Sequence, residues 1–198
     1  MFHIFPRAVP KKECERLLNY CIKNTNFSEA SVLNKGDSDT VGQSGRVDPR
    51  IRKTDIAFVT PDCQDDNRVN EIAWHFLTLA NEIKFNYKFE SFQPVQFARY
   101  RDGGHYRRHQ DVNESGISPH GELRKLSLTF SLSDPKTYEG GHLEFYRGER
   151  PMEEQDKEDI RDQGSVVVFD SRDYHRVTSV TKGTRYSIVC WTVGPNFI

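Results

Sequence analysis

Two segments of the chain carry hydrophobic residues at the spacing of one helical face. In the first segment, Pro10 suits the first turn of a helix. The apolar positions that follow recur at i, i+3, i+4, i+7 and i+8, and they are Cys14, Leu17, Leu18, Cys21 and Ile22. The second segment runs from about Asn67 to Lys84, with a stripe of Val69, Ile72, Ala73, Phe76, Leu79, Ala80 and Ile83. The pattern predicts two amphipathic helices that each cover a core with one face.

From residue 94 onward the pattern changes to short runs rich in β-branched and aromatic residues, separated by turns that contain Gly, Pro or Asp. The runs are PVQFARY, RKLSLTFSL, GHLEFYR, GSVVVFD, HRVTSVT and TRYSIVCWTV, and TDIAFVT at 54–60 precedes them. Their spacing predicts an antiparallel sandwich or barrel with the two helices packed on its outside. We therefore expect a mainly β fold with flanking helices, in one domain over residues 1–198 whose helical and loop support (1–93) precedes a β core (94–198).

Two polar stretches interrupt these elements. The stretch LNKGDSDTVGQSGRVDPRIRK is nearly free of apolar residues, which predicts a mobile loop across residues 31–52. RPMEEQDKEDIRDQ at 150–163 is a charged excursion between two strands, and we expect it to be a solvated loop.

Charge and composition restrict the possible partners. Lys and Arg number 28 against 29 Asp and Glu, so the net charge of −1 gives little attraction toward nucleic-acid phosphates. No apolar run approaches the roughly 20 residues that cross a bilayer, so no membrane partner is expected. The N-terminal MFHIFPRAVPKKE lacks the order of a signal peptide, which favours a soluble protein of the cytoplasm. In that reducing compartment the four cysteines, none of them in a CxxC pair, are expected to be free thiols.

The candidate chemistry begins at His109-Gln110-Asp111. In an extended chain residues i and i+2 point to the same side, so an imidazole and a carboxylate there aim at one point. A third ligand is available from His175, which opens a later strand. Two histidines and one carboxylate on one face form the facial triad of non-haem Fe(II) oxygenases.

Two other interpretations of these residues have to be weighed. One His-x-Asp triplet arises readily by chance, and a buried histidine bonded to a carboxylate would explain it structurally. A zinc site through His105 and His109 would need a helix to bring the two rings together. The preceding Gly103-Gly104, and Tyr106 where a zinc-protease motif has glutamate, argue against that helix.

Arg185, in the strand-like run TRYSIVCW, adds a second feature. A guanidinium there could hold a dicarboxylate through two parallel hydrogen bonds, and Ser187 lies on the same face of the strand. A solvent-facing arginine on an edge strand is the alternative. The aromatic and apolar neighbours disfavour it.

The order of these motifs resembles that of the 2-oxoglutarate- and Fe(II)-dependent oxygenases, specifically the prolyl 4-hydroxylase branch. The likeness is carried by YRDGGHYRRHQD, by the strands RKLSLTFSLS and EGGHLEFY, and by GSVVVFDSRDYHRVTSVTKGTRYSIVCW. IRKTDIAFV also looks like the strand that enters the core after the substrate loop of that family. The resemblance covers residues 94–194 well and the N-terminal half more loosely.

The resemblance implies a double-stranded β-helix, or jelly roll, of eight antiparallel strands in two facing sheets with the metal at the open mouth. The implied Fe(II) ligands are His109, Asp111 and His175. The implied 2-oxoglutarate residues are Arg185, at the C5 carboxylate, with Tyr100, Thr129 and Ser187. Tyr106, Arg124 and Trp191 match positions that line the substrate mouth. Where some relatives offer a tyrosine to the C5 carboxylate, this chain has only Ser127, Thr129 and Ser131, which leaves the second carboxylate partner open.

The activity implied is that of a dioxygenase that uses Fe(II), 2-oxoglutarate and O₂, with ascorbate as a further candidate. It would convert 2-oxoglutarate to succinate and CO₂ while hydroxylating proline in a protein or peptide, as a monomer or weak dimer. The long polar loop, which would close over the substrate, and the aromatic mouth favour a peptide over the alternative of a small molecule such as a free amino acid or metabolite. A nucleic-acid demethylase is disfavoured, because Trp191 stands where those enzymes have a second arginine. A non-catalytic β-barrel binding module is the remaining alternative, and it would be indifferent to Fe(II).

Overall fold

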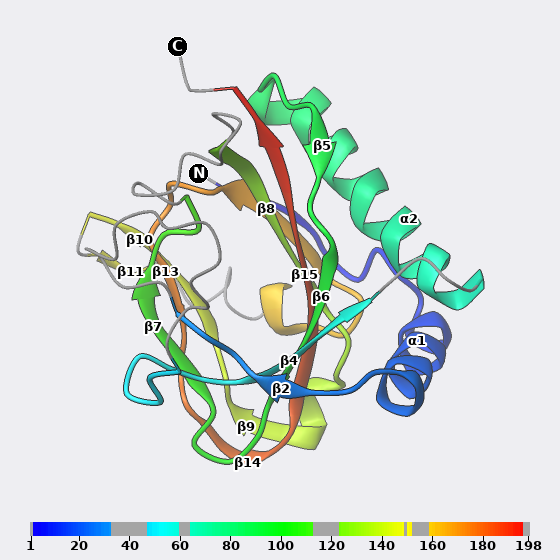
Figure 1. Cartoon of the computed structure of the whole chain (residues 1–198), viewed down its shortest axis with the longest axis vertical. Coiled ribbons are helices and arrows are strands. Elements are labelled where there is room, and N and C mark those ends of the chain that lie inside the picture. The colour runs from blue at the N-terminus through cyan, green and yellow to red at the C-terminus, as the bar shows by residue number, and fades with distance from the viewer. Residues whose placement is uncertain are drawn as a thin grey trace.

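The computed structural model describes residues 2–32, 47–59, 64–112, 123–148, 150–151 and 159–195. Over these residues the chain forms two facing antiparallel sheets with two helices outside the larger one (Figure 1). The predicted polar loop lies largely outside the described residues, since 33–46 are not included. Among the described residues no helix is both long enough and apolar enough to cross a membrane.

The major sheet has the strand order β1-β12-β8-β15-β6-β4-β2, with β5 paired to β15. Its strands are β1 (Phe2–Phe5), β2 (Ser28–Glu29), β4 (Asp55–Val59), β5 (Ser91–Phe92), β6 (Val95–Tyr100), β8 (Leu123–Ser131), β12 (Val166–Asp170) and β15 (Arg185–Gly194). The run at 54–60 was predicted as a strand, whereas β1 was not. Four apolar or aromatic residues are too short to show a period, and β1 is defined by its pairing with β12.

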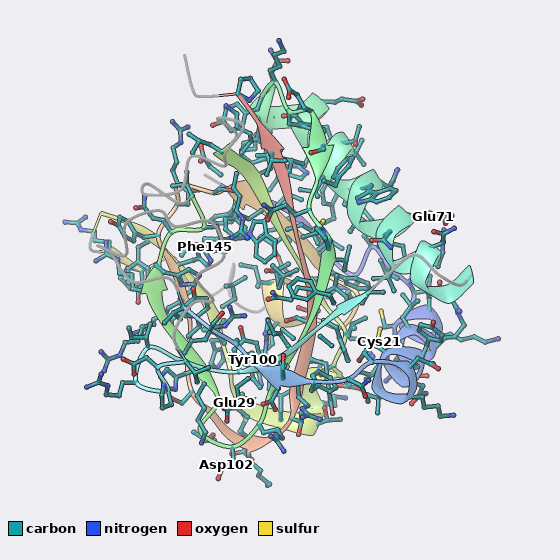
Figure 2. All side chains as sticks on the ribbon, in the orientation of Figure 1. Cys21, Glu29, Glu71, Tyr100, Asp102 and Phe145 are labelled. Atoms are coloured by element: carbon teal, nitrogen blue, oxygen red, sulfur yellow. The ribbon has the colours of Figure 1, made fainter. Side chains whose placement is uncertain are left out.

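The minor sheet has the order β11-β10-β13-β7-β3, and a two-stranded ribbon, β14-β9, accompanies it. The strands are β3 (Arg52–Lys53), β7 (His105–His109), β9 (Tyr138–Gly140), β10 (Leu143–Arg147), β11 (Arg150–Pro151), β13 (His175–Val177) and β14 (Val180–Gly183). Tyr100 of β6 and Phe145 of β10 belong to the apolar cluster between the sheets, and both side chains can be located in Figure 2.

Two helices cover the outer face of the major sheet, α1 (Lys11–Asn24) and α2 (Gln64–Ala80), as the periodicity predicted. On α2 the register of burial differs at the end, because Leu77 is fully buried whereas Ile83 is 56% exposed. Ile83 lies within a π-helical turn at Asn81–Phe85, which rotates it away from the stripe. Leu77 precedes that turn and is a position on the buried face that the predicted stripe left out. Cys14, Cys21 and Cys190 are buried free thiols, as expected, and Cys63 lies outside the described residues.

The charged stretch at 150–163 differs from the predicted solvated loop where the structure describes it. Arg150 and Pro151 form β11, and Ile160 is only 2% exposed within the cluster between the sheets. Arg161 donates hydrogen bonds to the carbonyl oxygens of Tyr138 and Gly140. Ile160 is isolated among charged residues and shows no sequence period, so its burial could not be predicted.

Candidate active site

Strand pairing brings the predicted metal ligands together. In the minor sheet β13 runs beside β7, with His175 opposite His109. Asp111 lies two residues after the end of β7, and its N–H donates to the carbonyl oxygen of Ser171, in the turn that precedes β13. Because both histidines lie on paired strands, their rings are only 4.2 Å apart between centroids.

The three side chains converge on one point. Nε2 of His109 lies 3.5 Å from one carboxylate oxygen of Asp111, and Nε2 of His175 lies 3.6 Å from the other. The Nδ1 atoms of these rings lie 2.8 Å and 3.0 Å from the carbonyl oxygens of Arg107 and Asp173. Since a carbonyl only accepts, each Nδ1 carries the proton and each Nε2 presents its lone pair to the shared point. Two imidazole nitrogens and a carboxylate suit a divalent iron.

Burial and mutual contact set the charges of this group. Burial is the main cause that lowers the pKa of His175, to about 4, and His109 adds to it, so His175 is neutral at neutral pH. Burial alone would raise the pKa of Asp111, but the positive charge that His175 and His109 carry when they are protonated outweighs it and holds the pKa well below its usual range. Neutral imidazoles and an ionised carboxylate are the protonation states that metal coordination requires.

Aromatic rings enclose the histidines. The ring of Tyr106 stacks on His109 with 3.5 Å between centroids, while Phe169 and Phe145 lie 4.7 Å and 5.9 Å from His175. Burial raises the pKa of Tyr106 to about 12, so its phenol is neutral. These rings restrict rotation of both imidazoles and keep bulk water away from them.

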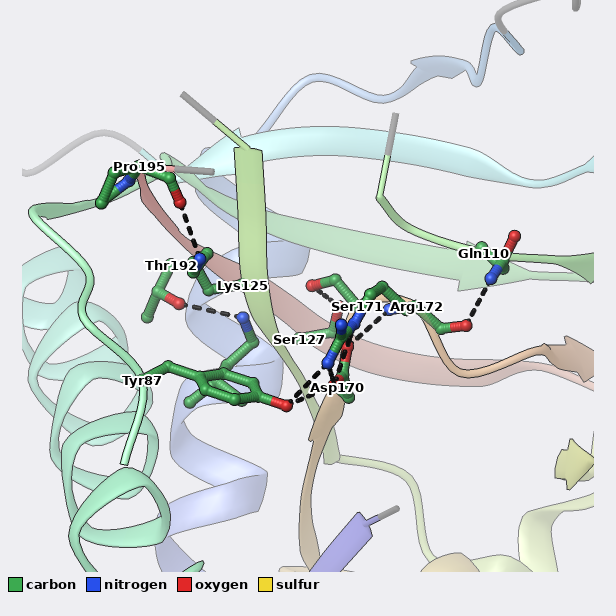
Figure 3. Close-up of polar contacts among 10 residues, drawn as sticks. Tyr87, Gln110, Lys125, Ser127, Asp170, Ser171, Arg172, Thr192 and Pro195 are labelled. Carbon is green, nitrogen blue, oxygen red and sulfur yellow. Dashed lines mark hydrogen bonds and ion pairs between the residues drawn. The ribbon is translucent and has the colours of Figure 1, made fainter. Parts of the chain in front are cut away.

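The turn at 170–175 leads into His175 and is hydrogen-bonded to the segment that carries Asp111. Figure 3 shows some of these contacts. The carbonyl oxygen of Ser171 accepts from the N–H groups of Asp111 and Val112, and its hydroxyl bonds that of Ser127 at 2.9 Å. The Gln110 amide donates to the carbonyl oxygen of Arg172. The turn therefore fixes the position of Asp111 relative to His175.

An ion pair supports this turn from outside the site. Asp170 accepts from Nε and an NH₂ group of Arg172 at 2.9 Å and 2.6 Å, and from the phenol of Tyr87 (Figure 3). Tyr87 is held in turn by Asn81, whose side chain bonds both its N–H and its carbonyl oxygen. The sequence contained the Ser-Arg-Asp motif but no sign that Tyr87, over 80 positions earlier, completes it.

Arg185 is buried, at 4% exposed, at the start of β15. It pairs in register with Tyr100, its guanidinium lies 5.2 Å from that ring, and one of its NH₂ groups donates to Ser187 at 3.1 Å. Thr129 pairs with Val189 of β15, whereas Ser187 pairs with Ser131, so Thr129 lies two residues farther along the sheet. The close approach of the Arg185 stem needs Gly141, where a Cβ would lie 3.1 Å from Cδ of Arg185 and 2.9 Å from Val180. The Gly-Gly of EGGHLEFY was the sequence signal for this packing.

The residues predicted to line the mouth also meet. The Arg124 guanidinium lies 3.9 Å from the ring centre of Trp191, and its Nε donates to Gln93 at 2.8 Å. It also approaches the carbonyl oxygen of Asp111 at 3.5 Å. The sequence reasoning missed Arg52, whose guanidinium lies 4.6 Å from the Tyr106 ring, because it falls in the polar stretch taken as a loop.

The zinc alternative is wrong for these residues. His105 and His109 lie at the two ends of strand β7, so they share no helical face. Nδ1 of His105 is bonded to the carbonyl oxygen of Gly103 at 3.0 Å. Among the described residues that could hold a metal, the group that forms is His109, Asp111 and His175, with ligand atoms within 4.8 Å of one another.

Comparisons with known proteins agree with this interpretation of the site. The family model of the 2OG-Fe(II) oxygenase superfamily matches residues 95–193. A PKHD-type hydroxylase of Pseudoalteromonas atlantica is 38% identical over 102 residues, which cover 50% of this chain and 42% of that protein. A second, of Maricaulis maris, is 29% identical over 162 residues, covering 77% of this chain and 68% of that one. This chain thus spans less than half the length of the first of these relatives.

Two solved structures have a similar fold. A Pseudomonas putida prolyl-4-hydroxylase superposes with a TM-score of 0.67 at 21% identity, covering 96% of this chain and 91% of that one. A prolyl hydroxylase from Trichoplax adhaerens, in complex with a hypoxia inducible factor peptide fragment, gives 0.68 at 20% identity, covering 96% and 82%. The expected jelly-roll fold is confirmed. With the family model matched across the strands that carry the triad and Arg185, the chain belongs to the 2OG-Fe(II) oxygenase superfamily.

Proposed function

We propose that this protein is an Fe(II)- and 2-oxoglutarate-dependent dioxygenase that hydroxylates proline in a peptide or protein. The observation that carries the proposal is the convergence of His109, Asp111 and His175, with both Nε2 atoms and an ionised carboxylate directed at one point. Membership of the oxygenase superfamily and similarity to PKHD-type hydroxylases support it. In this proposal residues 1–198 act as one oxygenase domain.

Bound iron and 2-oxoglutarate would supply the oxidation, in which 2-oxoglutarate and O₂ give succinate, CO₂ and a hydroxylated substrate. His109, Asp111 and His175 would hold the iron, and 2-oxoglutarate and O₂ would bind beside them. The protein itself orients the reactants and excludes water. Ascorbate would serve as a reductant that restores Fe(II).

Arg185 would hold the C5 carboxylate of 2-oxoglutarate. Its side chain is buried, and the hydrogen bond found for it among the described residues goes to the neutral hydroxyl of Ser187. A buried cation with a neutral partner favours an anion by charge-assisted hydrogen bonds. Tyr100 and Ser187 adjoin this site, and Thr129 contributes to the same inner face farther along β8.

Tyr106, Arg124 and Trp191 would bind the substrate beside the iron. Tyr106 stacks on the ligand His109, and Arg124 joins Trp191 to the backbone of Asp111, so both are adjacent to the metal ligands. A peptide substrate is supported by the similar structure that holds a peptide fragment.

The test is succinate formation from 2-oxoglutarate with Fe(II) and ascorbate, followed by NMR with and without proline-containing peptides. Iron-dependent succinate that rises with a peptide and disappears in His109→Ala supports the proposal. Succinate without peptide stimulation retains the dioxygenase and indicates a small-molecule substrate. A folded, iron-loaded protein that makes no succinate under any condition contradicts the proposal.

A further inference from the structure

Among the described residues, the arginines that bond other side chains fall into two groups by the kind of side chain they bond. Arginines toward the surface bond carboxylate groups, namely Arg7, Arg16, Arg50, Arg68, Arg99, Arg101, Arg172 and Arg176. Arg185, Arg52 and Arg124, which lie at or near the candidate active site, bond neutral side chains among the described residues. Arg185 is accounted for by the C5 carboxylate of 2-oxoglutarate, so the other two need an explanation.

Arg52 donates one hydrogen bond to the side-chain oxygen of Gln96, at 3.0 Å. Its Nε is buried and has no hydrogen-bond partner in the part of the chain that the structure describes. The guanidinium lies over Tyr106, the ring that stacks on the metal ligand His109. A buried donor without an acceptor is destabilising, so the position is suited to a ligand that supplies one.

Arg124 repeats this arrangement from the other sheet. Its Nε donates to the side-chain oxygen of Gln93, and its guanidinium stacks on Trp191. Nε1 of Trp191 is a further buried donor, with no hydrogen-bond acceptor among the residues described. Arg52 lies over the ring that stacks on His109, and Arg124 approaches the carbonyl oxygen of Asp111 at 3.5 Å, so both cations adjoin the candidate metal ligands.

The region around Tyr106 therefore has an excess of hydrogen-bond donors and positive charge. Asp111 supplies a carboxylate beside this ring, and its two oxygens face the histidines of the triad. Gln93 and Gln96 orient the two guanidiniums without neutralising them. A planar guanidinium with unused donors selects a carboxylate, which can accept two parallel bonds.

We propose that Arg52 and Arg124 bind a carboxylate of the substrate beside the metal ligands, so that the enzyme acts on a carboxylate-bearing substrate. This inference rests on the proposed dioxygenase function and narrows its substrate class. The carboxylate has two possible sources. It is either an acidic side chain next to the hydroxylated proline, or the α-carboxylate of a terminal or free proline.

Matched substrate pairs test the proposal through binding, measured by isothermal titration calorimetry on the full chain loaded with Mn(II) and 2-oxoglutarate under argon. The first pair is a capped peptide with Pro-Glu against the same peptide with Pro-Gln. The second is a peptide that ends in proline as the free acid against its amide, and the third is L-proline against prolinamide. In one pair or more we expect the acid to bind about tenfold more tightly or better, as a charge-assisted bond implies.

The preference should require both arginines. Arg52→Gln and Arg124→Gln should each reduce the ratio of acid to neutral affinity toward one, with little change for the neutral ligand, whereas Arg52→Lys should retain part of it. Arg108→Gln is the matched control, because this exposed β7 arginine bonds the carbonyl oxygen of Gly148 and should leave the ratio unchanged. In the wild-type protein, added salt should weaken the acid more than the neutral ligand.

The outcomes separate this inference from the proposed function. The pair that shows the preference identifies the source of the carboxylate. The carboxylate site is overturned if acid and neutral ligands bind equally or if no ligand of any pair binds. It is also overturned if the preference for the acid persists in both Arg52→Gln and Arg124→Gln. Iron-dependent succinate formation would persist in those cases if the dioxygenase proposal is correct, and its absence would count against that proposal alone.

Discussion

The two faces of the major sheet carry different kinds of side chain, although the same strands form both. On β8, Leu126, Leu128 and Phe130 are fully buried against the helices. The intervening side chains, Ser127, Thr129 and Ser131, point to the space between the sheets, as do Arg185 and Ser187 of β15. Because side chains alternate along a strand, one sequence supplies an apolar face and a polar face at every second residue.

The comparison teaches where stability and chemistry reside. The outer face of β8 buries Leu126, Leu128 and Phe130, so its contribution is mainly hydrophobic and depends on packing volume. The inner face keeps buried polar and charged groups, each of which is costly unless it is paired or reserved for a ligand. Substitutions on the outer face should therefore change folding, and substitutions on the inner face should change ligand binding.

The largest effect is expected at the metal ligands. Asp111→Ala should lower iron-dependent succinate formation by more than about a hundredfold, since loss of groups that merely support a ligand already costs 10–100-fold. The independent readout is thermal unfolding, in which added Mn(II) should raise the midpoint of the wild-type protein and not that of the variant. An unchanged metal-induced rise in the variant would remove Asp111 from the ligand set.

On the outer face, Leu128→Ala should reduce the free energy of unfolding by about 2–5 kcal/mol, because it leaves a cavity in a fully buried position. Urea unfolding measures this loss. Leu128→Met conserves volume and should cost less than about 1.5 kcal/mol. Leu128→Ala should leave intact the rise in unfolding temperature that Mn(II) causes. If a folded variant lost that rise, the assignment of stability to the outer face and ligand binding to the inner face would be wrong.

Asp170→Asn tests the support of the turn that joins Asp111 to His175. The loss of a charge-assisted bond to Arg172 should cost about 1–3 kcal/mol of unfolding free energy. It should also weaken Mn(II) binding by about tenfold, since the turn positions the ligands. Arg176→Gln breaks the ion pair with Glu144 on the minor sheet and is the control, with less than about 1 kcal/mol expected and no change in metal binding.

The same residue predicts a pH dependence. Burial would raise the pKa of Asp170, but hydrogen bonds from Arg172 and Tyr87 outweigh it and hold the pKa below its ordinary value. Since the folded-state pKa is the lower one, the stabilisation is complete above the unfolded value of about 4 and is lost as the pH falls through the folded value. The difference in unfolding free energy between wild type and Asp170→Asn should shrink across that acidic range, and a constant difference would contradict the assignment.

The smallest effect is expected for Tyr87→Phe. It removes one hydrogen bond to Asp170 and one from Arg172, at a cost of about 1 kcal/mol in unfolding free energy. Mn(II) binding should change less than in Asp170→Asn, because the ion pair of Asp170 with Arg172 remains. A loss of metal affinity equal to that of Asp170→Asn would show that the phenol, rather than the ion pair, fixes the turn.

The sequence by itself determined the elements whose periods are long or repeated. The 3.6-residue stripes predicted α1 and α2, and the runs of β-branched and aromatic residues predicted a mainly β fold. The spacing of His109 and Asp111 placed both side chains on one side of an extended chain. Local sequence could not predict β1 or the burial of Ile160, because neither has a period, and it missed the π-helical turn that exposes Ile83.

Only the tertiary structure decided how distant residues meet. The pairing of β7 with β13 sets His175 against His109, and the turn before β13 fixes Asp111 by backbone hydrogen bonds. Arg52 and Tyr87 come from segments whose polar character gave no sign of a role at the site. Charge and hydrogen-bond demand depend on burial and on neighbours in space. The sequence therefore named the candidate metal ligands, whereas the fold showed which groups orient them and which buried donors lie near them.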